Sequence, residues 1–334
     1  MQDQPDFDPD DVDWERLEEL RDGFLDGATG SYWRNAADVE LYDTTFGRRI
    51  AWKWAAVLDE LAARGFVAPG GRWLDWGAGS AIATREMLRR SAQSAVERVT
   101  LVDRSAPALE FARKALAKER PKLAIETKPE VDAEQGPFDL VLVSHVISEL
   151  HPHDLGRLTS LLATARAFVW VESAARDGSR ALSAVREQLL AQHDPIAPCA
   201  HREACGVLAT GRERDWCHFF ATPPPHVFTS REWGLFGRKL GVDLRSLPYS
   251  FLAMRSRADV RFPEQASRLL GRARVERASL RFQCCEASGI RDRRFLRRHD
   301  GKLFNQLSET RLAPKLVRWR FEGEEIVGVD ERLA

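Results

Sequence analysis

Apolar runs of strand length alternate with helix-like segments between residues 72 and 171, and this alternation constrains the fold more than any other sequence feature. Apolar residues recur with helical periodicity in the intervening segments 81–90, 106–119 and 154–163. Strands that alternate with helices at this spacing predict an α/β fold with a doubly wound parallel sheet. The five expected strands span residues 72–76, 99–103, 123–127, 138–143 and 167–171.

A glycine loop, Gly77-Ala78-Gly79, directly follows the first expected strand. Its glycines let the backbone approach a ligand where a β-carbon would clash. Asp103 ends the second expected strand, where a carboxylate can accept hydrogen bonds from two ribose hydroxyls. A dinucleotide site would need Gly or Ala at the position of Ile82, whereas Asp-x-Gly-x-Gly is the pattern of S-adenosylmethionine methyltransferases. We therefore expect S-adenosylmethionine to be held by Asp75, Gly77, Gly79, Asp103 and Ser144.

The segment after the fourth expected strand, Ser144 to Leu150, lacks a recognisable methyl-acceptor motif. Enzymes that methylate amino groups commonly carry Asn/Asp-Pro-Pro-Tyr/Phe here to grip the target nitrogen. His145 can serve as a general base, although a strand-end histidine with ordinary hydrogen bonds is the commoner case. The sequence therefore assigns no catalytic residue and leaves enzymatic activity open.

Five cysteines are too few for a disulfide scaffold, and three of them fall within nineteen residues of a polar, proline-punctuated stretch. The spacing is Cys-x5-Cys-x11-Cys, followed much later by Cys284-Cys285. A zinc knuckle with two cysteines two to four residues apart is missing, and four thiolates from irregular spacings suit an iron–sulfur cluster. His201 and His218 keep a mixed Cys/His zinc site open. We rank an iron–sulfur cluster first, zinc second and free thiols third.

The formal net charge is zero, with 50 Lys+Arg against 50 Asp+Glu, but the charges are segregated along the chain. Residues 1–20 carry nine acids and one base, and we expect residues 1–12 to be a solvated, frayed end. Residues 255–320 carry eighteen Lys+Arg and seven Asp+Glu. Arginines clustered around an aromatic residue suit phosphate contacts and base stacking, so we favour RNA contact over a neutral solvated face. The cluster is Arg291, Arg293, Arg294, Arg297 and Arg298 around Phe295.

Four consecutive segments are expected from these patterns. Residues 1–65 form an acidic tail and a helical N-terminal region, and residues 66–190 form the Rossmann-like core. Residues 191–230 form a cysteine-rich insertion, and residues 231–334 complete the sheet and supply a basic, β-rich C-terminal part. No apolar run approaches the roughly 20 residues needed to span a bilayer, and the acidic start resembles neither a signal nor a transit peptide. We therefore expect a cytoplasmic protein without membrane contact, acting as a monomer.

The cysteine motifs resemble those of a methyltransferase-like family of mitochondrial small-ribosomal-subunit assembly proteins and their bacterial relatives. The resemblance covers roughly residues 40–320 and includes the strand-end signature Val143 to Leu150. Departures are Ala200, where the family often has Pro, and the absence of a Gly-Thr-Pro-like turn after Glu172. The resembling stretches are Pro198-Cys199-Ala200-His201, Cys205, Asp215-Trp216-Cys217-His218-Phe219 and Cys285-Glu286-Ala287-Ser288-Gly289.

This resemblance implies a class I S-adenosylmethionine-dependent methyltransferase fold carrying a 4Fe–4S cluster. By motif position the cluster ligands are Cys199, Cys205, Cys217 and Cys285, with Cys284 as an alternative fourth ligand. The family association implies binding to small-subunit rRNA and assistance in small-subunit assembly or translation. The alternative is a catalytically active rRNA methyltransferase.

Overall fold

The structure is a computed structural model that describes residues 6–25, 32–91, 95–257, 262–309, 315–323 and 325–333. The chain divides into two compact units, each assembled from segments that are discontinuous in sequence. This division differs from the four consecutive segments expected above, because strands distant in sequence pair with one another. The first unit comprises Met1–Leu58, Ala68–Trp170 and Ala221–Leu247, and the second comprises Asp59–Val67, Val171–Phe220 and Pro248–Ala334.

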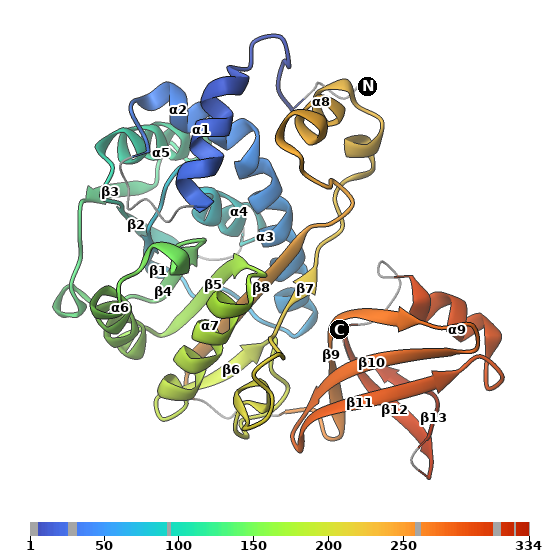
Figure 1. The fold of residues 1–334 in the computed structure, drawn as a ribbon. Coiled ribbons are helices and arrows are strands. Elements are labelled where there is room, and N and C mark those ends of the chain that lie inside the picture. The colour runs from blue at the N-terminus through green and yellow to red at the C-terminus, as the bar shows by residue number, and fades with distance from the viewer. Residues whose placement is uncertain are drawn as a thin grey trace. The chain divides into compact units, whose positions relative to one another are not determined.

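The first unit is built on a parallel sheet whose strand order, β3-β2-β1-β4-β5, confirms the α/β, Rossmann-like fold (Figure 1). In register, Trp73 of β1 lies between Val99 of β2 and Leu140 of β4. These three side chains are fully buried, as expected for a parallel sheet covered on both faces. The strands are β1 (Gly71–Trp76), β2 (Val96–Val102), β3 (Ala124–Lys128), β4 (Leu140–Ser144) and β5 (Ala167–Ser173).

Helices connect these strands close to the positions that the sequence predicts. The hydroxyl of Ser105 caps the helix after β2 by accepting a hydrogen bond from the Ala108 amide at 3.3 Å. Helices of the first unit are α1 (Trp14–Leu25), α2 (Ala36–Thr44), α4 (Ile82–Arg90), α5 (Ala106–Glu119), α6 (Pro152–Thr164) and α8 (Arg231–Leu240), together with most of α3 (Phe46–Ala63).

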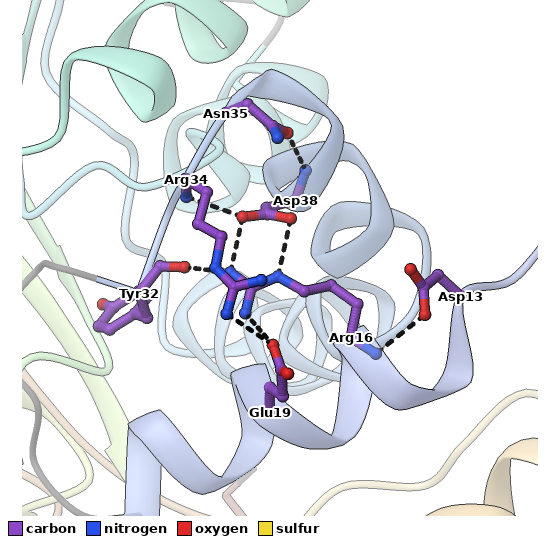
Figure 2. Close-up of polar contacts among 7 residues, drawn as sticks. All are labelled: Asp13, Arg16, Glu19, Tyr32, Arg34, Asn35 and Asp38. Carbon is purple, nitrogen blue, oxygen red and sulfur yellow. Dashed lines mark hydrogen bonds and ion pairs between the residues drawn. The ribbon is translucent and has the colours of Figure 1, made fainter.

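The lone base of the acidic N-terminal segment, Arg16, ties α1 to α2 (Figure 2). Its guanidinium group donates two parallel hydrogen bonds to Asp38, at 2.9 and 2.7 Å, and another to Glu19. Asp38 also accepts a hydrogen bond from the Arg34 amide at 2.7 Å. Hydrogen bonds from Arg16 and Arg34 hold the pKa of the Asp38 carboxyl below its usual range, so this pair stays charged and fixes the helix pair.

The N-terminal segment is more ordered than a frayed tail, which corrects the expectation for residues 6–12. Phe7 is buried and packs edge-on against Trp233, with ring centroids 5.2 Å apart. Asp6 accepts hydrogen bonds from the Trp233 indole and from His226, both at 2.9 Å. An aromatic anchor and a satisfied carboxylate therefore hold this segment, whereas Asp3 lies outside the described residues.

The second unit contains an antiparallel arrangement of β6, β8 and β7, and a closed five-stranded barrel. Helix α7 (Arg176–Leu189) contacts β8. The strands outside the barrel are β6 (His193–Ala197), β7 (Phe219–Phe220) and β8 (Pro248–Ser256). The barrel contains β9 (Ala266–Val275), β10 (Ser279–Glu286), β11 (Gly289–Leu296), helix α9 (Gly301–Ser308), β12 (Leu316–Glu322) and β13 (Glu325–Arg332).

The barrel closes in the order β10-β11-β13-β12-β9, with α9 between its third and fourth strands (Figure 1). Strand β11 pairs with β13 in parallel, and the other described pairs are antiparallel. Five strands with this Greek-key order form the oligonucleotide/oligosaccharide-binding (OB) topology. The core is continuous, with Phe282, Phe295 and Trp319 packed against Phe304 and Leu307 of α9.

No helix among the described residues is long and apolar enough to cross a membrane.

Candidate functional site

The glycine loop of the first unit has the backbone conformation that its sequence predicts. Gly77 has φ +70° and Gly79 has φ +52°, in the left-handed region that favours glycine. A β-carbon added at Gly77 would lie 2.5 Å from a methyl carbon of Val146. Glycine at position 77 is therefore required both by conformation and by the close approach of the segment after β4.

Asp103 joins the end of β2 to the glycine loop. Its carboxylate accepts hydrogen bonds from the Gly79 amide at 2.9 Å and from the Ser105 amide at 2.8 Å. Burial raises the pKa of Asp103, and these two amide hydrogen bonds oppose the shift. The structure thus brings Asp103, Gly77 and Gly79 together at the carboxyl edge of the sheet, where ligands of open α/β sheets bind.

Asp75 occupies a different environment, fully buried beneath the loop. One carboxylate oxygen accepts hydrogen bonds from the Thr84 hydroxyl at 2.7 Å and from the Thr84 amide at 3.3 Å. Burial raises the pKa of Asp75 to about 7. Among the described residues, its other oxygen and the buried hydroxyl of Ser80 have no hydrogen-bond partner. Two buried polar atoms beside a glycine loop leave hydrogen-bonding capacity that a polar cofactor can use.

The end of β4 and the segment after it contact residues of the N-terminal region, which the sequence did not single out. Ser144 accepts a hydrogen bond from the Trp54 indole at 2.9 Å. His145 has φ +56°, and its Nε2 lies 3.2 Å from Nζ of Lys53. The Tyr32 hydroxyl lies 3.1 Å from a Glu149 carboxylate oxygen. No local pattern marks Lys53, Trp54 or Tyr32, because each lies 90 or more residues before its partner in or after β4.

The four expected ligand cysteines lie in the second unit, near enough for their charges to interact. Burial raises the pKa of the Cys217 thiol far above its ordinary value, and Cys199, Cys285 and Cys205 raise it further. Burial is also the main reason that the pKa of Cys285 is raised, and Cys199 and Cys205 raise it further. Without a bound metal the thiols of Cys217 and Cys285 stay protonated at neutral pH.

The neighbouring cysteines at 284 and 285 point to opposite sides of β10, because side chains alternate along a strand. Cys284 is completely buried in the barrel core beside Phe282 and Trp319. Cys285 faces outward, and its sulfur lies 3.5 Å from Nε2 of His201. This geometry favours Cys285 over Cys284 as the fourth member of the cysteine group.

Arginine side chains hold the segment 196–215, which we call the cysteine loop. Arg180 of α7 donates to the backbone carbonyls of Val207, Arg212 and Asp215, at 2.5 to 3.0 Å. Arg64 donates to the carbonyls of Ile196, Pro198 and Cys199, at 3.0 to 3.1 Å. These two arginines satisfy loop carbonyls in place of a large apolar core.

A third arginine, Arg186, is almost fully buried beside the cysteines and donates to the His201 carbonyl at 2.8 Å. Burial alone would lower the pKa of Arg186, yet the pKa is raised because Cys199, Glu187 and Cys205 favour its charged form. The arrangement therefore places a fixed positive charge next to the thiols.

The two histidines that kept a zinc site open have separate contacts. Burial lowers the pKa of both rings, so both are neutral. His218 stacks on Trp216, with centroids 4.6 Å apart, and its Nδ1 lies 3.1 Å from the Trp216 carbonyl. His201 lies against Cys285, as described above.

A single metal ion and an iron–sulfur cluster place different demands on these donors. Within the described ranges, no group of three or more His, Cys, Asp or Glu side chains is placed to hold a single metal ion. A 4Fe–4S cluster is larger than one ion and is held by four thiolates that are farther apart. Its net negative charge suits the buried guanidinium of Arg186. The residues present therefore fit a four-cysteine cluster by donor chemistry and local charge.

Solved methyltransferase structures are among those similar to this chain. No curated protein matches the chain. A candidate RNA methyltransferase from Pyrococcus horikoshii aligns with TM-score 0.39 and 13% identity, over 61% of this chain and 84% of that one. The N-methyltransferase NodS from Bradyrhizobium japonicum, solved with S-adenosyl-l-homocysteine, aligns with TM-score 0.37 and 13% identity, over 72% of this chain and all of that one (100%).

A family model described as mitochondrial small ribosomal subunit Rsm22 matches residues 48–312. This range includes the glycine loop, the cysteine loop and most of the barrel, and it confirms the resemblance drawn from the cysteine motifs. The chain therefore belongs to the Rsm22 family.

Proposed function

We propose that this protein binds small-subunit rRNA, S-adenosylmethionine and a 4Fe–4S cluster, and assists assembly or translation of the small ribosomal subunit. The observation that carries the proposal is the gathering of Cys199, Cys205, Cys217 and Cys285, three of them near Arg186, in a member of the Rsm22 family. A monomeric state and a cytoplasmic location belong to the same proposal.

S-adenosylmethionine would be held at the glycine loop. Asp103 can bind ribose hydroxyls, and Gly79 leaves room for a ligand against the backbone, because no atom of the described residues lies within 4 Å of a β-carbon added there. The unpartnered oxygen of Asp75 and the hydroxyl of Ser80 are available for polar contacts. Ser144 is the fifth proposed residue, although its hydroxyl already accepts a hydrogen bond from Trp54. When bound, the cofactor supplies an electrophilic methyl group.

The proposed cluster has a structural role. It would connect the cysteine loop to β10 through Cys285, so that binding free energy becomes folding free energy for this part of the unit. Arg186 would offset its negative charge. We assign no electron transfer to the cluster.

The neighbouring cysteines of β10 provide a matched test of the cluster. After anaerobic purification, wild type should show visible absorption with stoichiometric iron and sulfide. Cys285→Ala should lose most of both, because it removes an outward-facing thiol of the cysteine group. Cys284→Ala should keep them, because that side chain lies in the barrel core. A colourless wild type with stoichiometric zinc, or equal iron in the two variants, would contradict the assignment.

Association with the ribosome is tested separately by sedimentation. Purified holoprotein should move with small subunits, or with their assembly precursors, through a sucrose gradient and should not move with large subunits. Failure to sediment with either form of the small subunit would contradict the proposed role.

An active rRNA methyltransferase is the second candidate. The observation that favours it is His145, which is held in a left-handed conformation 3.2 Å from Lys53 at the end of β4. Such backbone strain clusters at functional sites. Transfer of a labelled methyl group to small-subunit RNA, abolished by Asp103→Ala, would establish catalysis. Bound cofactor without any transfer would favour the assembly role alone.

A further inference from the structure

The outer surface of the barrel carries three arginines side by side, one on each of three neighbouring strands. Arg281 of β10 lies directly opposite Arg274 of β9 on one side and Arg294 of β11 on the other. All three side chains are exposed, whereas Leu280 and Phe295, their neighbours in sequence, are buried in the barrel core. We call Arg274, Arg281 and Arg294 the arginine row.

The chain neutralises only part of this charge. Like charges directly opposite one another destabilise a sheet. Arg281 pairs with Glu276 at 2.9 Å. A hydrogen bond from Ser279, followed by the charges of Arg281 and Arg294, lowers the pKa of Glu276. Arg274 and Arg294 form no ion pair with any described carboxylate, so among the described acids Glu276 alone is ion-paired with the row. Arg277 in the adjoining turn adds a fourth guanidinium group.

The arginine row occupies the open part of its barrel face. Farther along the same two strands, the side chain of Gln283 donates to Asp215 of the cysteine loop at 2.8 Å. A β-carbon added at Gly206 would lie 2.9 Å from the Ile290 amide. The cysteine loop therefore covers the far end of the β10–β11 face and leaves the end with the arginine row exposed.

The arginine row lies on the barrel face that binds oligonucleotides in other OB barrels. OB barrels bind oligonucleotides across the face of their second and third strands, which are β10 and β11 here (Figure 1). A fold alone does not establish a function, but this face also presents the three exposed guanidinium groups of the arginine row. Guanidinium groups form bidentate hydrogen bonds with phosphate.

We propose that the arginine row binds consecutive phosphates of single-stranded RNA. Strands lie about 4.8 Å apart, so the row spans roughly 10 Å, and a flexible single strand can adjust its phosphate spacing to that length. No side chain of the row is aromatic, so contact is to the backbone and is independent of base sequence. The inference rests on the proposed rRNA association for the source of the RNA.

The test measures binding of a fluorescent twelve-nucleotide RNA to the full holoprotein at several salt concentrations. The variant R274A/R281A/R294A should bind at least about tenfold more weakly. The slope of log K against log salt should become shallower by about 2, since each single-strand phosphate contact contributes about 0.7. R274K/R281K/R294K should keep most of the slope, because lysine retains the charge.

Two controls separate a specific surface from total charge and from misfolding. R166A/R231A/R245A removes three exposed arginines of the first unit and should change the slope by much less. Iron content and melting temperature should match wild type in all three variants. Equal slopes for the row and control variants would overturn the proposal. So would equal or tighter binding of an RNA duplex or of a polyglutamate peptide.

Sedimentation with small subunits keeps this inference distinguishable from the proposed function. A wild-type protein that sediments with small subunits but does not bind the oligonucleotide would overturn the arginine row alone. A protein that binds the oligonucleotide through the row but does not sediment with small subunits would instead contradict the ribosomal role.

Discussion

At the scale of single residues, the buried carboxyl of Asp75 makes stability depend on pH in an unusual direction. Most carboxylates in folded proteins are stabilised in the charged form, but Asp75 is not paired with a cation and has a pKa of about 7. Between its ordinary value of 3.8 and about 7, the folded state therefore binds more protons than the unfolded state. Its contribution to the free energy of unfolding consequently falls as pH rises through this window.

Asp75→Asn should remove this dependence. The amide keeps an oxygen that can accept the hydrogen bonds from Thr84, and it carries no charge at any pH. The melting temperature of the variant relative to wild type should therefore rise between pH 5 and pH 7.5, and thermal scans in this range measure it. The full effect is at most about 4 kcal/mol, which is about 3 pKa units at 1.36 kcal/mol each. Parallel pH profiles for the two proteins would rule out a buried, titrating carboxyl.

Residues of the glycine loop were predictable because their signal is local. Gly77 and Gly79 lie within five residues of Asp75, and Asp103 ends the next strand, so pattern and spacing suffice. The arginines that hold the cysteine loop were not predictable. Arg180 and Arg186 lie on α7, where a charged residue in sequence indicates a solvated helix face, and only the tertiary structure shows their backbone partners.

At the scale of elements, the five parallel strands were predicted to within a few residues, because buried parallel strands are continuous apolar runs. The barrel was missed as a closed unit. β9 carries Arg268, Arg272 and Arg274, and β13 carries several acids, so neither has a clean apolar alternation. Closure also depends on the parallel pairing of β11 with β13 across α9, which periodicity does not reveal.

Helix α7 offers a prediction at this scale, since one side chain on it supports the whole cysteine loop. Arg180→Ala leaves three loop carbonyls without their donor. With hydrogen bonds to charged groups worth about 1.5–3 kcal/mol each, we expect faster amide hydrogen exchange across residues 205–217 and reduced iron content.

Arg176 supplies the matched control on the same helix. Its side chain is about half exposed and pairs only with the neighbouring Asp177 among the described residues. Arg176→Ala should therefore leave hydrogen exchange in the loop and iron content unchanged. Similar exchange rates in the two variants would show that the loop is held by other contacts.

At the scale of the whole molecule, the two proposed ligand sites belong to different compact units. The glycine loop and Asp103 lie in the first unit, and all four cysteines lie in the second. The net charge of zero likewise results from two oppositely charged regions, because acids are concentrated in the N-terminal segment and arginines in the barrel. Composition alone could therefore indicate neither the number of sites nor the place of any RNA contact.

Because the two proposed ligand sites belong to different units, we expect loss of the cluster to leave the binding of S-adenosylmethionine nearly unchanged. Removing the proposed cluster by oxidation and chelation should lower the temperature of the first calorimetric unfolding transition, because the cysteine loop and β10 would lose their connection. The affinity for S-adenosylmethionine, measured by titration calorimetry, should change by less than about twofold, as expected for independent sites. A large drop in cofactor affinity on cluster loss would show instead that the two sites are energetically coupled.

The discontinuous second unit also sets an order of events during synthesis of the chain. Cys199, Cys205 and Cys217 leave the ribosome before Cys285, which follows Cys217 by 285 − 217 = 68 residues. At about 5–20 residues per second, Cys217 waits roughly 3 to 14 seconds for the fourth thiol, and Cys199 and Cys205 wait longer. A cluster that requires all four can be inserted only after β9 and nearly all of β10 have been translated, so iron incorporation would follow the start of barrel synthesis.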